Sequence, residues 1–228
     1  MAGKATPDDQ EWLKRGQVLF AQECKFLRPV AKPEELPKTK LPEIAFAGRS
    51  NVGKSSLINA LTHRKTARVS NMPGRTRDIN VFDLGTRLTI ADLPGYGFAR
   101  LSKQTKEHWR ELIVAYLQHR AQLKRVCLLI DARHGAQDND LAMMTLLDLA
   151  SAPFHLVLTK IDKLNAFDRA AAIKDVERHI AEHPACLPEF VATSAEKGLG
   201  IPELRALLTR VARTPENGYK SAAGGRRA

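Results

Sequence analysis

The chain has 228 residues, of which 43% are hydrophobic, and carries a formal charge of +11 at pH 7. That length supports one domain with a sizeable core, plus extensions. No apolar run approaches the ~20 residues of a membrane span, and the polar start is no secretory signal. Three scattered cysteines exclude a disulfide framework and fit a reducing cytoplasm. The positive charge favours a polyanionic partner such as nucleic acid, with a merely basic surface as the alternative.

Residues 1–40 are predicted to be an N-terminal extension, helical from Glu11 to Lys25 and then kept extended by three prolines. Alternating strands and helices follow. Strands are predicted at 43–47, Ile79–Leu84, Arg87–Asp92, Val126–Ile130, Phe154–Leu158 and Glu189–Ala192. Helices are predicted at 54–62, Lys103–His119, Leu141–Leu149, 166–182 and Ile201–Val211. We assign 41–213 to one α/β domain and expect the basic tail, 214–228, to be disordered.

This alternation predicts a six-stranded, mostly parallel sheet with one antiparallel strand and helices on both faces. The antiparallel strand comes from a hairpin that turns at Gly85-Thr86. In open α/β sheets ligands bind outside the carboxyl ends of the strands. Four polar motifs follow predicted strands, so we expect them to converge at one edge of the sheet.

The first of these motifs is a phosphate-binding loop, G-x-x-x-x-G-K-S, between a short apolar strand and a helix. Its residues are Gly48, Arg49, Ser50, Asn51, Val52, Gly53, Lys54 and Ser55. Backbone N–H groups of such a loop form an anion nest, and the helix dipole adds positive potential. We expect Lys54 to reach the β- and γ-phosphates and the Ser55 hydroxyl to bind Mg²⁺.

The second motif is a D-x-x-G, formed by Asp92, Leu93, Pro94 and Gly95. A carboxylate at a strand end can hold Mg²⁺, usually through water, and the Gly95 N–H can meet the γ-phosphate. The pattern alone is weak, since many turns contain Asp and Gly. Its place after an apolar strand, about 40 residues beyond the glycine loop, strengthens the assignment.

The third and fourth motifs concern the base. They are Thr159-Lys160-Ile161-Asp162 and the weaker Thr193-Ser194-Ala195. A fixed carboxylate at Asp162 can accept from guanine N1–H and the 2-amino group, a donor pair that adenine lacks. Lys160 can lay its aliphatic stem along the purine. A backbone N–H near Ala195 would face guanine O6. A solvated strand end is the simpler alternative.

The stretches GRSNVGKSSLINAL (48–61), NMPGRTRDINVF (71–82), DLPGYGFAR (92–100), TKIDK (159–163) and TSAEKG (193–198) resemble the EngB (YihA/YsxC) family of bacterial GTPases. The family belongs to the translation-factor-related GTPase class, and the resemblance covers about residues 20–212. It implies a P-loop GTPase fold, with GTP and GDP as substrate and product and Mg²⁺ as cofactor. The usual motif begins with Asn where this chain has Thr159.

The resemblance also implies a switch segment that contacts the nucleotide. It consists of Gly74, Arg75, Thr76, Arg77 and Asp78. Thr76 would complete the Mg²⁺ shell with Ser55, while Asp92 contacts the ion through water. Lys54, Thr76 and Gly95 are then the expected catalytic residues. Tyr96 stands where many GTPases place the glutamine that orients water, so we expect slow intrinsic hydrolysis.

The family resemblance implies a role in assembly of the large ribosomal subunit and in normal cell division and septation. We expect a cytoplasmic monomer whose partners are the subunit precursor and its rRNA. Two alternatives remain open. One is a P-loop kinase or ATPase, which shares the glycine loop but not the T-K-x-D and D-x-x-G motifs. The other is a nucleotide-stabilised module that binds RNA or division proteins with negligible hydrolysis.

Overall fold

The computed structural model describes residues 6–63, 78–97 and 103–213. Its helices are α1 (Pro7–Phe20), α2 (Lys54–Thr62), α3 (Lys103–His119), α4 (Asp138–Leu149), α5 (Ala166–Glu182) and α6 (Ile201–Thr209). Its strands are β1 (Cys24–Val30), β2 (Glu43–Gly48), β3 (Ile79–Leu84), β4 (Leu88–Asp92), β5 (Leu123–Asp131), β6 (Phe154–Thr159) and β7 (Val191–Ala192). Within these ranges, no helix combines the length and apolar character needed to cross a membrane.

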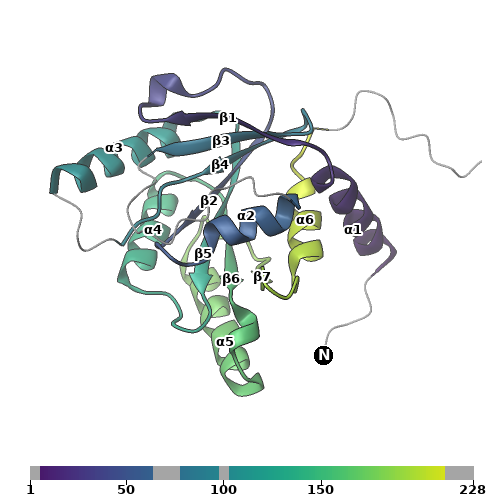
Figure 1. Ribbon diagram of the computed structural model, residues 1–228. Helices are drawn as coiled ribbons and strands as arrows, with labels where there is room; N and C mark the ends of the chain where they lie inside the picture. Colours follow the sequence, from purple (N-terminus) through teal and green to yellow (C-terminus); the bar gives the residue numbers. More distant parts are fainter. Residues whose placement is uncertain (1–5, 64–77, 98–102, 214–228) are drawn as a thin grey trace, which may run out of the picture.

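The strands form one mixed sheet in the order β1-β3-β4-β2-β5-β6-β7 (Figure 1). Only β3 runs against its neighbours, pairing antiparallel with both β1 and β4. The pairs from β4 to β7 are parallel, which brings their carboxyl ends to one edge. The predicted fold class, a mostly parallel α/β sheet with one antiparallel strand, is therefore confirmed.

The number of strands differs from the prediction, because the sheet has seven strands rather than six. The additional strand is β1, which begins at Cys24, inside the helix predicted from Glu11 to Lys25, and continues into the segment expected to be extended and proline-rich. Only its first and last residues, Cys24 and Val30, are buried, so the strand lacks the alternation that marks a half-buried strand. Helix α1 also differs, since it starts at Pro7 behind a Thr6–Asp9 capping box and ends at Phe20.

Two hydrophobic layers cover the sheet, one on each face. Strand β2 shows the alternation that separates them: Ala45 and Ala47 face one layer, and Ile44 and Phe46 face the other. Helices α3, α4 and α5 close the first layer, whereas α1, α2 and α6 close the second. This packing fixes the strands and thus the edge where the polar motifs begin.

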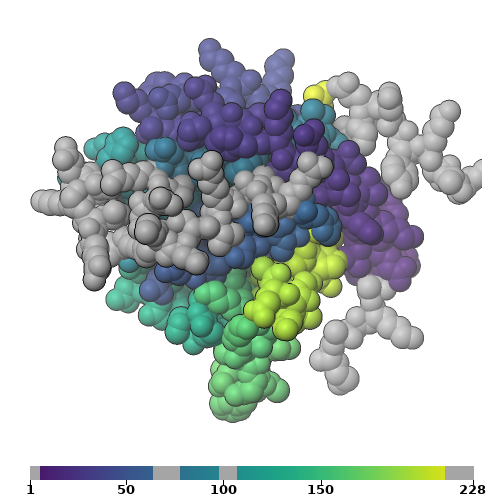
Figure 2. Space-filling view, in the orientation of Figure 1, coloured from purple at the N-terminus to yellow at the C-terminus, as the bar shows by residue number. Residues whose placement is uncertain are grey.

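Helices α1 and α6 lie side by side at one end of the molecule (Figure 2). Gly16 makes this close approach feasible, because a Cβ there would lie 2.7 Å from the backbone nitrogen of Ala206. The guanidinium of Arg210 lies 5.7 Å from the centre of the Trp12 ring and adds a cation–π contact. Helix α1 is thereby joined to α6, the last helix in the described part of the chain.

The tight helix pair predicts the effect of a single methyl group. Gly16→Ala should destabilise the protein by about 1–2 kcal/mol, because overpacking outweighs the gain in helix propensity. Urea unfolding monitored by circular dichroism measures the change. The matched variant Gln17→Ala, exposed on the same helix, should stay within about 0.5 kcal/mol of the wild type. A Gly16→Ala protein more stable than the wild type would contradict the close packing.

Candidate nucleotide-binding site

The glycine loop lies between the end of β2 and the start of α2. Gly48 is the last residue of β2, and α2 begins at Lys54 with Gly53 as its N-cap. Asn51 and Gly53 adopt left-handed backbone angles, with φ of 64° and 104°. These turns leave the free N–H groups of the α2 N-terminus at the sheet edge, where a helix attracts anions.

The D-x-x-G loop packs directly on the glycine loop. The N–H of Ser50 donates to the carbonyl of Tyr96 at 3.0 Å. A Cβ on Gly95 would come within 2.9 Å of the Ser50 hydroxyl oxygen and 3.4 Å of the Ser50 backbone nitrogen, so the two loops are in close contact here. Leu93 is buried, and the carbonyl of Pro94 accepts from Trp109 Nε1 at 3.3 Å. The first two motifs therefore meet, as predicted from their places in the chain.

Lys54 and Asp92 form an ion pair through Nζ and Oδ1, and both side chains are largely buried. Asp92 ends β4 and pairs in register with Phe46 of β2. The register thus brings the ammonium group of one motif and the carboxylate of another to the same point. A cation beside an oxygen ligand at a helix N-terminus suits a phosphate–metal pair.

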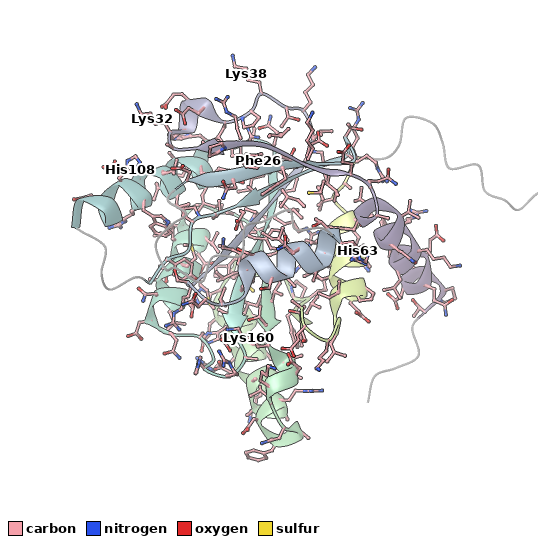
Figure 3. The ribbon with its side chains drawn as sticks, in the orientation of Figure 1. Phe26, Lys32, Lys38, His63, His108 and Lys160 are labelled. Atoms are coloured by element: carbon pink, nitrogen blue, oxygen red, sulfur yellow. The ribbon has the colours of Figure 1, made fainter. Side chains whose placement is uncertain are left out.

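The third motif is bound to the glycine loop from the other side. The Thr159 hydroxyl donates to the carbonyl of Val52 at 2.7 Å, and Lys160 Nζ donates to the carbonyl of Asn51 at 2.7 Å. Lys160 lies near the carboxyl ends of the strands (Figure 3). Its stem approaches the loop, since Lys160 Cε would lie 3.7 Å from a Cβ at Gly53.

The third and fourth motifs are joined through the backbone. The N–H of Ile161 donates to the carbonyl of Thr193 at 3.1 Å. A hydrogen bond from the Ser194 side chain lowers the pKa of the Asp162 carboxyl, which keeps it ionised. Asp162 Oδ2 is buried and forms an ion pair with Lys163 Nζ at 3.2 Å, but it accepts no well-directed hydrogen bond from the described residues. Ala195 follows Ser194 in the chain and is half-buried.

Asp131, which directly follows the predicted strand Val126–Ile130, is a site residue that the sequence analysis did not single out. Its carboxylate accepts from Lys160 Nζ at 2.8 Å and makes a two-point contact with Arg133. Partial burial opposes ionisation, but hydrogen bonds from Arg133 and Lys160 outweigh it and lower the pKa of Asp131 to about 2. The sequence did contain a signal for Asp131: it is a carboxylate at the end of a predicted strand, and that strand lies in the chain between the glycine loop and the T-K-x-D motif.

Tyr96 is directed into the core. Its hydroxyl donates to Asp140 Oδ1 at 2.8 Å, and its ring packs edge-on against Trp109. Burial, followed by the nearby Asp140 charge, raises the pKa of Tyr96 well above its usual value. This side chain connects the loop after β4 to α4 and to α3.

The expected switch segment falls mostly outside the described ranges, which omit Gly74, Arg75, Thr76 and Arg77. Asp78 is half-buried immediately before β3. Ser55 is half-buried in the first turn of α2. The structure therefore brings the 48–55, 92–95, 159–162 and 193–195 motifs together, while the nucleotide contacts of all the named residues stay predictions.

Sequence comparison with known proteins identifies the family to which the chain belongs. The probable GTP-binding protein EngB of Caulobacter vibrioides is 47% identical over 203 residues, covering 89% of each chain. The chain belongs to the EngB family. Residues 43–160 of this EngB-family chain also match the family model described as 50S ribosome-binding GTPase. The predicted family resemblance is thus confirmed.

Two solved structures resemble this EngB-family fold. A crystal structure of a probable GTP-binding protein EngB aligns with a TM-score of 0.61 at 30% identity, covering 74% of this chain and 97% of that one. Era in complex with MgGDPNP and nucleotides of 16S ribosomal RNA aligns with a TM-score of 0.61 at 25% identity. That alignment covers 79% of this chain and 60% of Era.

The network around Asp131 predicts a pH-dependent loss of stability. Because its folded pKa is below the unfolded value, Asp131 stabilises the fold above about pH 4, and this contribution disappears as pH falls to about 2. Asp131→Asn should cost about 1 kcal/mol at pH 7, after allowance for solvent screening. Urea unfolding at pH 7 and pH 3 should show roughly half that penalty at pH 3.

Asp138→Asn is the matched control, because Asp138 is exposed in the first turn of α4. We expect it to change stability by less than about 0.5 kcal/mol at either pH. An equal penalty for Asp131→Asn at both pH values would show that its charge is not what stabilises the network.

Proposed function

We propose that this EngB-family chain is a cytoplasmic GTP-hydrolysing switch that assists assembly of the large ribosomal subunit and supports normal cell division and septation. The carrying observation is the direct contact between the glycine loop and its two neighbouring motifs, through Ser50, Val52 and Asn51. Such an arrangement supports one ligand with phosphates at one end and a base at the other. Family membership supports the choice of GTP.

Guanine recognition is proposed for Asp162. Asp162 is an ionised, half-buried carboxylate, and its Oδ2 contacts the Lys163 ammonium without a well-directed hydrogen bond from the described residues. Such a carboxylate can accept from a ligand that offers two N–H groups. The ammonium of Lys160 is held by Asn51 and Asp131, so its stem is positioned to cover the purine face. An adenine base would leave the carboxylate without a matching donor pair, which selects against ATP.

Phosphate and Mg²⁺ binding is proposed for the α2 N-terminus and its surroundings. Lys54 would bind the phosphates, while Ser55, Thr76 and, through water, Asp92 would hold the metal. The Lys54–Asp92 ion pair supports this, because both groups already occupy one point of the site. When bound, Mg²⁺ would neutralise phosphate charge as it builds up during hydrolysis. The structurally similar Era was solved with MgGDPNP.

Slow hydrolysis follows from the role of Tyr96. Its hydroxyl is engaged by Asp140, and the side chain has no amide with which to orient water. Catalysis would then depend on positioning by Lys54, Gly95 and Thr76, and on a partner that accelerates the reaction. The charge of +11 supports salt-sensitive binding to rRNA of the subunit precursor.

Base specificity tests the assignment of Asp162. Asp162→Asn should weaken GDP binding at least about 100-fold, since two charge-assisted hydrogen bonds are removed, and should improve binding of xanthosine diphosphate. Titration of fluorescent nucleotides measures both affinities. Glu196→Gln is the control, because Glu196 shares the Lys163 contact but is exposed. If ATP competed with GDP as well as GTP does, the P-loop kinase or ATPase alternative would replace the proposal.

Lys54→Ala separates a GTP-controlled switch from the alternative, a nucleotide-stabilised binding module. The variant should lose nucleotide binding and with it the GTP-dependent co-sedimentation with large ribosomal subunits. Retained co-sedimentation would favour the module. Phosphate release by the wild type should be slow alone and faster with subunits; turnover of several per second by the isolated protein would contradict our assignment of Tyr96.

A further inference from the structure

The outer edge of the sheet exposes an unusual run of residues on β1. This strand pairs only with β3, so its other side is unpaired within the described sheet. All five residues from Lys25 to Pro29 are exposed. Phe26 is 49% exposed and Leu27 is 39% exposed, and both lie between basic residues. We call residues 25–29 the β1 edge.

The β1 edge is poorly suited to pairing with another strand. Pro29 has no N–H to donate, and the register shifts between Phe26 and Arg28, which leaves Leu27 in a bulge. Lysine and arginine on an edge strand also oppose strand addition. An extended protein segment is therefore a disfavoured partner, although the edge offers apolar surface.

The chemistry of the β1 edge matches single-stranded nucleic acid instead. The Phe26 ring lies 5.4 Å from the ring of Phe82, tilted by 58°, so the core supports it while about half of it stays exposed. A supported aromatic face can stack on an unpaired base, and neighbouring cations can bind phosphates. Lys25 and Arg28 supply such cations next to Phe26 in the chain. They pair in register with Asp83 and Val81 and so lie on the opposite face of the edge from Phe26, which means that a bound strand would wrap around this edge.

The segment after β1 adds further positive charge. This strap, residues 31–42, carries exposed Lys32, Lys38 and Lys40. In Figure 3, Lys32 and Lys38 project from the upper border of the molecule, and Phe26 lies below them, along β1. The strap also carries two acidic residues: Glu34 is exposed, and Glu35 accepts from the backbone N–H of Ala31 at 2.9 Å. Its three lysines therefore outnumber its carboxylates by one. The strap therefore extends the basic character of the β1 edge.

The strap is hydrogen-bonded to an arginine that also forms a buried ion pair. Arg120 donates to the carbonyl of Pro37 at 3.0 Å and binds the fully buried Glu43 through two nitrogens. A cavity of about 450 Å³ lies between the strap and the end of α3, lined in part by Lys38, Lys40 and His119. The cations are thus presented on a fixed backbone, which lowers the entropic cost of binding.

We propose that the β1 edge and the strap bind single-stranded RNA, with a base stacked on Phe26 and phosphates bound by Lys25, Arg28 and the lysines of the strap. The proposal rests on the proposed function for the source of this RNA, the ribosomal precursor. It assigns RNA binding to a border of the sheet formed by residues outside the nucleotide motifs.

Fluorescence anisotropy with a labelled, mixed-sequence RNA of roughly 12 nucleotides tests the proposal on the full chain with GDP. Phe26→Leu keeps apolar bulk but removes the aromatic face, and should weaken RNA binding about 5- to 100-fold. Phe26→Tyr should retain wild-type affinity. Phe167→Leu is the matched control, since Phe167 is 82% exposed on α5, and it should have no effect. Thermal unfolding checks that each variant is folded.

A second pair of variants separates local binding from overall charge. Lys25→Ala with Arg28→Ala should weaken binding and reduce the salt slope by about 0.7 for each phosphate that the protein no longer neutralises. Lys14→Ala with Lys174→Ala removes the same charge from α1 and α5, and should leave the affinity within about twofold of the wild type.

Three results with RNA alone would overturn the RNA proposal: no RNA binding by the wild type, equal effects in test and control variants, or wild-type affinity in Phe26→Leu. An acidic peptide is a further test. If it bound as tightly as RNA and its affinity were unchanged in Phe26→Leu, the edge would be a general surface for binding anions and the proposal would fail. GDP affinity, measured on the same preparations, reports separately on the proposed function, because Phe26 lies outside the nucleotide motifs.

Discussion

The hydrogen bond from the Thr159 hydroxyl to the carbonyl of Val52 joins the two halves of the candidate site. It connects the end of β6 to the loop that leads into α2, across 107 positions in the chain. The bond is buried, so water cannot replace either partner at low cost. The distance between the phosphate end and the base end is thereby set by the sheet, since both strands are fixed in register with β5.

Much of this arrangement is encoded locally. Helix α2 begins after Gly53, its N-cap residue. Helix α5 begins after Asn165, whose side chain caps its N-terminus. Parallel pairing then brings the strand ends together without any long-range information beyond the alternation of strands and helices. The four motifs could accordingly be predicted to converge before their contacts were known.

Other features depend on contacts that sequence patterns do not carry. Strand β1 has exposed charged and apolar residues in succession, so hydrophobic periodicity cannot identify it. Asp131 resembles any acidic residue that ends a strand until Lys160 is seen to bind it. The Tyr96–Asp140 bond spans 44 positions and shows why this tyrosine is buried, a fact that the D-x-x-G pattern leaves undetermined.

The close contact of α1 with α6 has a consequence for how the chain is made. Translation produces Gly16 of α1 long before Ala206 of α6, yet these two residues lie against each other. The apolar face of α1, including Leu19 and Phe20, thus has no complete binding surface until α6 has left the ribosome. A nascent chain of this protein therefore leaves part of that face uncovered while the sheet and its other helices are being synthesised.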